Sequence, residues 1–451
     1  MGTDLLNEAL LHPVFQIRPA AFFHPEAPTY KSRSVFFGPR FENSSLFGAV
    51  LRLALLYCAL LCGNAAFSAD EAVRPDVGKL LNKAQELHGL KEYAQALGQI
   101  AEAEKIGTLK PLERFYAERM RAMVLISTDD QAGAAKTLEA ALASERGGDA
   151  DRLAILENLV LTHYRAKAYT KSAAWAERYL AQGGTNAGIA DVQIQALYLA
   201  KQYPSAAALL DKQVSAIIAA KRTPTDAQLR MLASAYQQNK DDANYLKTAK
   251  IIARYYPKPE IWKELIYRVL ARNDFPDVLE IDSNRLLRAT KSPIKTAELL
   301  EQAQLTLATG YAGEAFDILS AVDRNDSTIP ASELIRLDQM LAKVTRMRQE
   351  DEAALSSLDA RMEAAKEPNL LVNAALSLSF LGNHAHALAM VDRALAKPGL
   401  RQPEMAKLRK AYVLARADKR EEALALLDTI SGTSPEAELA GLWRIFLQSS
   451  N

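Results

Sequence analysis

Histidine and cysteine are the residues of this chain best suited to metal binding or nucleophilic catalysis, and they are few and scattered. Both cysteines, Cys58 and Cys62, lie in one apolar run. His384 and His386 are close in sequence, but residues two apart point to different faces of a helix, so they fit surface positions better than a metal site. The remaining histidines are His12, His24, His88 and His163. The sequence therefore predicts no metal site, no cofactor and no cysteine chemistry after residue 69.

Carboxylate pairs and glycine-rich motifs give no catalytic signature either. Glu421 with Glu422, and Asp241 with Asp242, are acidic pairs that fit the solvated faces of helices. The chain holds no HExxH, GxSxG or Walker A motif. The glycines of RYLAQGG and ATGYAG follow no strand, so they indicate turns rather than phosphate cradles. We therefore expect a protein that is not an enzyme.

The charge balance argues against nucleic acid as a partner. The 451 residues carry 55 Lys and Arg against 54 Asp and Glu, a formal net charge of +1. Apolar residues make up 49% of the chain and charged residues 24%, as in a soluble globular protein. A chain this close to neutrality has no long-range attraction to a polyanion. The expected partners are proteins or peptides.

From residue 75 onward the sequence has helical character and a repeat. YRAKAYTKSAAWAERYL (164–180) recurs as YLAKQYPSAAALLDKQV (198–214), so that Tyr169 of the first copy corresponds to Tyr203 of the second. The Ala387–Ala423 interval is nearly as long as the Tyr169–Tyr203 interval. The Ala315–Ala387 interval is twice the Ala387–Ala423 interval, which predicts that Ala315 and Ala387 are two units apart. The stretch 255–293 stays helical but loses this small-residue pattern. A fixed period of this length is typical of a helical repeat.

This repeat resembles the tetratricopeptide repeat (TPR), a helix–turn–helix unit of about 34 residues. The resemblance implies an all-α fold, a TPR-like α-solenoid of about nine or ten helical hairpins over residues 70–451, wound as a right-handed superhelix. In such a unit Gly310 and Gly382 end the first helix in a left-handed turn, and Tyr93, Tyr169 and Tyr203 cover the turn. Small residues let the helices of a unit cross closely and close the unit; these are Ala96, Ala315, Ala375, Ala387, Ala394 and Ala423.

Solenoids of this kind bind peptides or partner proteins on the concave face lined by the first helix of each unit. The repeat register places seven candidate partner-binding residues there: Glu157, Tyr164, Arg165, Asp191, Gln195, Tyr198 and Gln237. Some relatives hold a C-terminal carboxylate with Lys and Asn at two groove positions. This chain has Glu157 and Leu161, then Asp191 and Gln195, at those positions, which argues against binding of chaperone tails. The alternative is that many of these side chains only pack between units.

The segment 1–69 differs sharply from the rest of the chain. Residues 1–46 hold five prolines and six phenylalanines without any period, and we interpret them as a non-native or disordered extension before the true start. Residues 47–69 contain an apolar run interrupted by Arg52 and then small residues, which fits a signal peptide. A membrane span needs about 20 apolar residues. An inner-membrane anchor through residues 47–61 and a core helix remain alternatives; the signal peptide predicts export to the periplasm.

A narrower resemblance runs through five segments in order. These are VRPDVGKLLNKAQEL (73–87), RYLAQGG (178–184), QALYLAKQYPSAAALL (195–210), QQNKDDANYLKTAKIIARYYPKPEIW (237–262) and AQLTLATGYAGEAFDIL (303–319). Together they are similar to a family of secreted bacterial TPR proteins described as components of the TonB system. The resemblance covers residues 72–325. It implies a Gram-negative periplasmic scaffold, with TonB, ExbB or ExbD as possible partners, and offers no catalytic residue to carry over.

Three functional hypotheses follow. The first is a non-enzymatic, exported scaffold that serves TonB–ExbB–ExbD-dependent transport across the outer membrane. The second is an envelope assembly factor or chaperone-like TPR adaptor unrelated to TonB. The third is a repeat-decorated hydrolase, which would need a cluster of titratable residues that the sequence does not contain.

Overall fold

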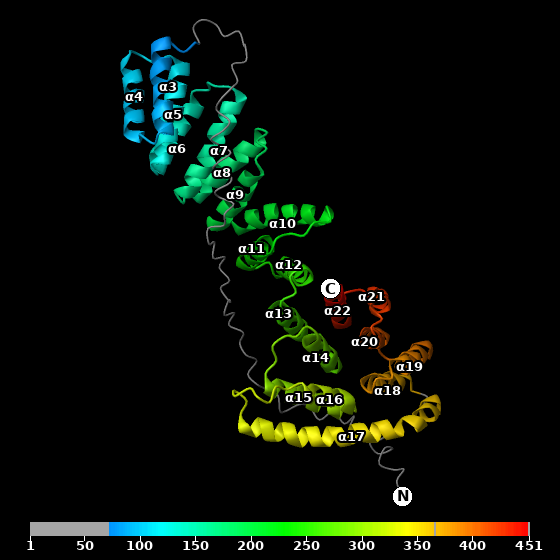
Figure 1. Cartoon of the computed structure of the whole chain (residues 1–451). Helices are drawn as coiled ribbons and strands as arrows, with labels where there is room; N and C mark the ends of the chain where they lie inside the picture. Colours follow the sequence, from blue (N-terminus) through cyan, green and yellow to red (C-terminus); the bar gives the residue numbers. More distant parts are fainter. Residues whose placement is uncertain (1–71, 365–366, 450–451) are drawn as a thin grey trace. The chain divides into compact units, whose positions relative to one another are not determined.

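The computed structural model describes residues 72–364 and 367–449, and every regular element in these ranges is helical (Figure 1). Twenty α-helices and one short 3-10 helix, η1 (Asp277–Leu279), are present there. The all-α prediction is confirmed. The predicted extension (1–46) and signal peptide (47–69), with Cys58 and Cys62, lie outside the described residues. Among the helices of the described ranges, none combines the length and the apolar content needed to cross a membrane.

The described helices form nine hairpins, within the predicted number, and leave α17 (Ala331–Ala364) and α22 (Pro435–Ser449) as single helices. We call the first helix of a hairpin A and the second B. The A/B pairs are α3 (Pro75–Gly89) and α4 (Tyr93–Lys105), α5 (Pro111–Ser127) and α6 (Gln131–Ala143), α7 (Asp149–Arg165) and α8 (Tyr169–Ala181), α9 (Ala187–Leu199) and α10 (Tyr203–Ala219), α11 (Asp226–Gln238) and α12 (Asp242–Tyr255), α13 (Pro259–Leu270) and α14 (Glu280–Ala289), α15 (Thr296–Ala308) and α16 (Ala312–Ser320), α18 (Pro368–Phe380) and α19 (His384–Ala396), and α20 (Pro403–Arg416) and α21 (Arg420–Asp428).

Eight of the hairpins share one turn geometry. One turn residue has a positive φ in each, and the next N–H donates to the carbonyl five residues earlier at 2.9–3.0 Å, which closes helix A. The positive-φ residues are Lys91, Asp129, Lys167, Lys201, Lys240, Gly310, Gly382 and Asp418. Glycine, the residue that adopts this conformation without steric cost, occupies only two of the eight turns.

The crossing alanines keep the same register from hairpin to hairpin. Ala96, Ala315, Ala387 and Ala423 each lie five residues after the positive-φ residue of their turn, and each side chain is fully buried. Ala375 and Ala394 are also fully buried. A larger side chain at these positions would separate the two helices, because the interior is already close-packed.

One predicted unit is absent from the described residues between Ala315 and Ala387. Their spacing predicts a complete intervening hairpin, but α17 is one continuous helix of 34 residues, so this prediction is wrong. Arg346 pairs with Glu350, and Arg348 with Glu352, one helical turn apart. The stretch TRMRQEDEA (345–353) holds no glycine or proline. Helix propensity and these pairs stabilise a continuous helix at the point where a turn is expected.

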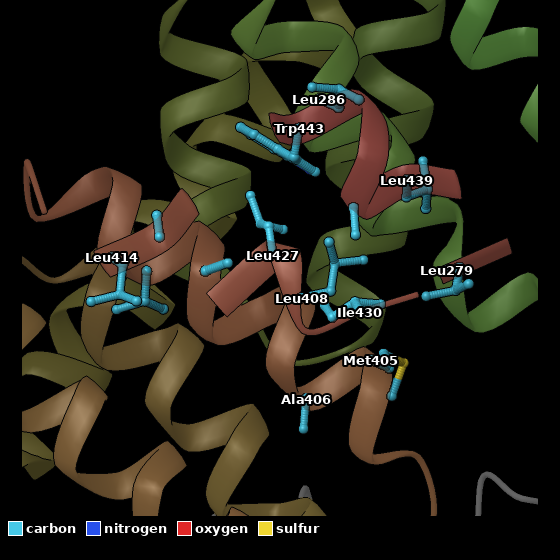
Figure 2. Close-up of a cluster of buried hydrophobic side chains, with 14 of the residues drawn as sticks. Leu279, Leu286, Met405, Ala406, Leu408, Leu414, Leu427, Ile430, Leu439 and Trp443 are labelled. Atoms are coloured by element: carbon cyan, nitrogen blue, oxygen red, sulfur yellow. The ribbon is translucent and has the colours of Figure 1, made fainter. Parts of the chain in front are cut away.

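The last helices pack back onto the middle of the chain. Helix α22 contacts α12 and α13, and the rings of Trp262 and Phe446 meet edge to face at 5.9 Å. Figure 2 shows Trp443 of α22 in the same buried cluster as Leu286 of α14 and Leu427 of α21. A sequence repeat predicts contacts only between neighbouring units, so this return contact appears only in the tertiary structure.

Candidate protein-binding face

The seven candidate residues lie on the A helices of three consecutive hairpins. Glu157, Tyr164 and Arg165 are on α7; Asp191, Gln195 and Tyr198 are on α9; and Gln237 is on α11. Tyr164, Tyr198 and Gln237 each lie five residues before the first residue of the following B helix, so they occupy equivalent positions. We call this surface the A-helix face.

Tyr164 joins α7 to α9. Its hydroxyl donates to Gln195 Oε1 at 3.1 Å, and its ring meets the ring of Tyr169, the first residue of α8, edge to face at 5.5 Å. Burial raises the pKa of Tyr164, so the phenol stays protonated and remains a donor. Two of the predicted residues, Tyr164 and Gln195, are thus in direct contact.

Tyr198 joins α9 to α11 in the same way. Its hydroxyl lies 2.7 Å from Ser234 Oγ on α11, and its ring packs edge to face on Tyr203, the first residue of α10, at 5.4 Å. Ser234 was not among the predicted residues. Its sign would have been the repeat register, since Ser234 and Gln195, the partner of Tyr164, each lie eight residues before the first residue of the following B helix.

A third, equivalent link occurs at the first hairpin. The rings of His88 and Tyr93 lie 5.7 Å apart, and His88 Nε2 is 2.9 Å from Ser127 Oγ on α5. We call these three links the ladder; its ring residues are His88, Tyr164 and Tyr198. The three links share a six-residue sequence pattern, seen in HGLKEY, YRAKAY and YLAKQY. The pattern begins with the ring residue, has the positive-φ lysine at its fourth position and ends with a tyrosine. That pattern is readable in the sequence and could have identified His88.

The two carboxylates of the A-helix face have local partners. Glu157 Oε1 accepts from Asn186 Nδ2 at 2.9 Å, and Asp191 Oδ1 accepts from Gln213 Nε2 at 2.8 Å. Asn186 also caps α9 by accepting from the backbone N–H of Gly188. Acidic groups at these positions repel a terminal carboxylate. The surface therefore suits a neutral or basic peptide.

Arg165 and Gln237 are the candidate residues with free polar groups. Both side chains are exposed near the C-terminal ends of α7 and α11, and neither forms a hydrogen bond or ion pair within residues 72–364 and 367–449. Leu199, at the end of α9, is also 40% exposed. A cation, an amide and an apolar side chain are thus available on three adjacent A helices.

His88, His163 and His384 each contact a neighbouring polar side chain. Nδ1 of His384 lies 3.0 Å from Ser379 Oγ, and burial lowers the pKa of His384. His163 is buried and its Nε2 lies 3.2 Å from Glu139 Oε1. No group of three or more His, Cys, Asp or Glu side chains in the described part of the chain is placed to hold a metal ion.

The most highly charged buried site lies elsewhere, between α14, α16 and α20. Arg285 donates from Nη1 to Asp282 Oδ1 at 2.7 Å and from Nη2 to Glu314 Oε2 at 2.6 Å. Arg288 also pairs with Glu314, and Arg409 pairs with Asp282 at 3.0 Å. We call these five residues the charge cluster. Its members are mutually paired and its central arginine is 2% exposed, which fits a structural clamp rather than a reactive site.

Aromatic rings surround the charge cluster. The Arg285 guanidinium carbon lies 5.2 Å from the ring centres of Tyr311 and Tyr412 and 5.8 Å from that of Phe380. Burial raises the pKa of both tyrosines, so they stay neutral beside the arginine. This site was not predicted from the sequence, because its partners are up to 127 residues apart.

Comparison with protein-family models gives no match, and comparison with curated proteins gives none either. Among solved structures, the chain is similar to a structure of Naa15/Naa10 bound to HypK-THB, with 15% identity and a TM-score of 0.29 over 80% of this chain. It spans 65% of the length of that chain. It is also similar to the P58(IPK) TPR domain (15% identity, TM-score 0.22, 79% of this chain and 100% of that one) and to yeast Tom70 (13%, 0.24, 82% and 94%). The TPR-like character of this protein is carried by its own hairpins, turns and crossing alanines.

Proposed function

We propose that this protein is a non-enzymatic scaffold that binds a partner protein or peptide on the A-helix face of α7, α9 and α11. The observation that carries the proposal is the ladder. It fixes three successive A helices to one another through side-chain hydrogen bonds, while Arg165 and Gln237 remain exposed without a partner in the described residues. A rigid surface with free polar groups loses little conformational entropy when it binds.

We also propose that the scaffold acts in the bacterial periplasm, as an accessory of TonB–ExbB–ExbD-dependent transport across the outer membrane. The sequence resemblance over residues 72–325 and the signal-peptide-like segment 47–69 support this location and role. The competing hypothesis for the function is an envelope assembly or chaperone-like adaptor unrelated to TonB. The competing hypothesis for the location is a protein anchored in the inner membrane through an uncleaved segment 47–61.

An envelope pull-down of tagged protein after iron limitation, with cross-linking in the cell and mass spectrometry, tests both parts. We expect recovery of TonB, ExbB or ExbD above an untagged control. Arg165→Glu combined with Gln237→Glu should reduce that recovery at least fivefold. The matched control, Lys171→Glu with Gln349→Glu, makes the same charge change at exposed positions of α8 and α17 and should leave it unchanged.

Three other outcomes would count against the proposal. Recovery of other envelope proteins alone would favour the assembly adaptor, and recovery of only cytosolic proteins would contradict export. Equal loss in both double variants would show that the A-helix face is not the binding surface. The mass of the native N-terminus separately tests the signal peptide, because an intact Met1 would contradict cleavage.

A further inference from the structure

Helix α12 carries three basic side chains on one face. Lys247, Lys250 and Arg254 are spaced three and four residues apart, so they line one side of the helix. The buried residues of α12 lie on the opposite side; they are Thr248, Ala249, Ile252 and Ala253. None of the three cations forms an ion pair with another residue of the described ranges. Arg254 stands over the ring of Tyr255 at 5.6 Å.

Two further cations lie on the loop that precedes α11. Lys221 and Arg222 are exposed and have no ion-pair partner within the part of the chain that the structure describes. Tyr256 Oη donates to the carbonyl oxygen of Pro224 at 2.9 Å, which ties this loop to the end of α12. Arg222 comes two residues before Pro224, and Arg254 comes two residues before Tyr256, so each arginine is close in sequence to one partner of that hydrogen bond. We call the five residues Lys221, Arg222, Lys247, Lys250 and Arg254 the basic face.

The basic face is a local feature of a nearly neutral chain. Residues 201–270 carry 12 Lys and Arg against six Asp and Glu, whereas the whole protein has a net charge of +1. Elsewhere many basic side chains have acidic neighbours, as in the pairs Arg121–Glu104 and Lys410–Asp392. Grouped cations without counter-charges raise the local potential and repel one another, and a bound anion relieves this repulsion.

We propose that the basic face binds an acidic segment of a partner protein. The proposal rests on the scaffold function and gives it a second contact surface. The three α12 cations span about 10 Å along the helix axis. An extended chain places alternate side chains about 7 Å apart, so an acidic stretch of about five residues reaches all three. Lys250 and Arg254 supply the charge, and Arg254 adds a planar fork that fits a carboxylate.

Size and charge favour an acidic protein segment over nucleic acid. A nucleic-acid surface needs many phosphate contacts along an extended path and a strongly basic domain. The basic face has five cations within a protein of net charge +1. Two or three carboxylates match it without requiring a wider positive field.

The test measures binding of a fluorescein-labelled (Glu-Ser)5 peptide to the full chain by fluorescence anisotropy. (Gln-Ser)5 serves as the neutral peptide. We expect (Glu-Ser)5 alone to bind at 50 mM NaCl, and its affinity to fall at least tenfold at 300 mM NaCl because salt screens exposed charges. Lys250→Glu with Arg254→Glu should weaken binding at least tenfold. The matched control, Lys79→Glu with Lys171→Glu, changes net charge equally at exposed sites on α3 and α8 and should stay within twofold. Far-UV circular dichroism confirms that each variant is folded.

Each contrary outcome has its own meaning. Absence of peptide binding, or equal weakening by both double variants, would overturn the proposal. Tighter binding of a ten-nucleotide single-stranded RNA, lost in Lys250→Glu with Arg254→Glu, would assign the surface to nucleic acid. Salt-sensitive self-association lost in that variant, without peptide binding, would assign it to a second copy. Lys250→Glu with Arg254→Glu should leave the pull-down of partners through the A-helix face unchanged. Failure of the basic-face proposal is therefore distinguishable from failure of the scaffold function.

Discussion

Helices α3–α11 contact chiefly their neighbours in sequence, whereas α12, α13 and α14 also meet α20 or α22, more than a hundred residues away. In the first region the side-chain links between A helices join residues 31–39 positions apart in the sequence. In the second, Arg409 reaches Asp282 across 127 residues, and Arg272 donates to the carbonyl of Thr433 across 161. Stability in the first region is therefore a sum of neighbour contacts, while the second behaves as a more cooperative unit.

The two regions also place charge differently. The ladder consists of neutral rings and hydroxyl or amide groups, which cost little to desolvate. The charge cluster buries two arginines and two carboxylates, with Arg288 half-buried beside them, between helices that are distant in sequence. Replacing a buried ion pair with apolar groups is often neutral, but removing one partner leaves the other charge uncompensated. The largest mutational effects should therefore fall in the second region.

Arg285→Ala should have the largest effect. It leaves Asp282 and Glu314 buried with fewer partners, so we expect a loss of about 3–5 kcal/mol in the free energy of unfolding. Urea unfolding followed by tryptophan fluorescence measures it. Trp262 and Trp443 report on the second region and Trp175 on the first, so a variant lacking Trp175 isolates the signal. Arg114→Ala, at an exposed position, should cost less than about 0.5 kcal/mol. A loss below about 1 kcal/mol in Arg285→Ala would remove the contrast between the regions.

Glu113 tests a buried carboxylate of the first hairpins, which pairs with the partly exposed Arg74. Its carboxylate accepts from the backbone N–H and Nε of Arg74 at 2.8 and 2.9 Å, and these bonds hold its pKa at about 2, below the usual 4.5. Because the folded pKa is depressed, the stabilisation is present above pH 4.5 and is lost as the pH falls from 4.5 toward 2.

Glu113→Gln should therefore lower the free energy of unfolding by about 1–3 kcal/mol at pH 7, and the difference from wild type should vanish near pH 2. Urea titrations at a series of pH values measure this difference. Glu86→Gln changes an exposed carboxylate paired with Lys83 and should show less than about 0.5 kcal/mol at every pH. A difference for Glu113→Gln that does not depend on pH would contradict the assignment.

The ladder should contribute a smaller, pairwise energy. A double-mutant cycle with Tyr198→Phe and Ser234→Ala removes the 2.7 Å contact without removing the ring, and we expect a coupling energy of about 1 kcal/mol. Tyr203→Phe is the matched control, because the Tyr203 hydroxyl makes no hydrogen bond within the described residues. A coupling energy near zero would mean that ring packing alone joins α9 to α11.

The turns should show the smallest effect, and with the opposite sign. Lys201 adopts a φ of 61° where the hairpins α15–α16 and α18–α19 have Gly310 and Gly382. Lys201→Gly relieves a steric cost of about 1–2 kcal/mol but increases the freedom of the unfolded chain, so we expect a net stabilisation of about 0.5–1 kcal/mol. Thermal unfolding measures it. Lys212→Gly, in the exposed interior of α10, should instead cost about 1 kcal/mol. Destabilisation by Lys201→Gly would show that its side chain matters more than its backbone.

Local sequence patterns predict hairpins well and fail where distant contacts or a missing turn decide the structure. The repeat-length spacing of Ala387 and Ala423 identifies a real register, because each alanine lies at a helix crossing that permits no larger side chain. The same arithmetic fails between Ala315 and Ala387, because residues 345–353 form helix-supporting pairs instead of a turn. Of the candidate face, Tyr164 and Gln195 prove to be direct neighbours, while Ser234 and His88 were not selected.

The sequence by itself determined the helices, the hairpin turns and the repeat register. These depend on residues within about five positions of one another, such as a positive-φ residue and the alanine that follows it. Only the tertiary structure decided that α22 returns to α12 and α13, and that Asp282, Arg285, Glu314 and Arg409 share one buried site. Their pairing depends on where whole helices are placed. A buried arginine can be stable only where the fold brings enough carboxylates and rings around it, and no spacing in the sequence records that arrangement.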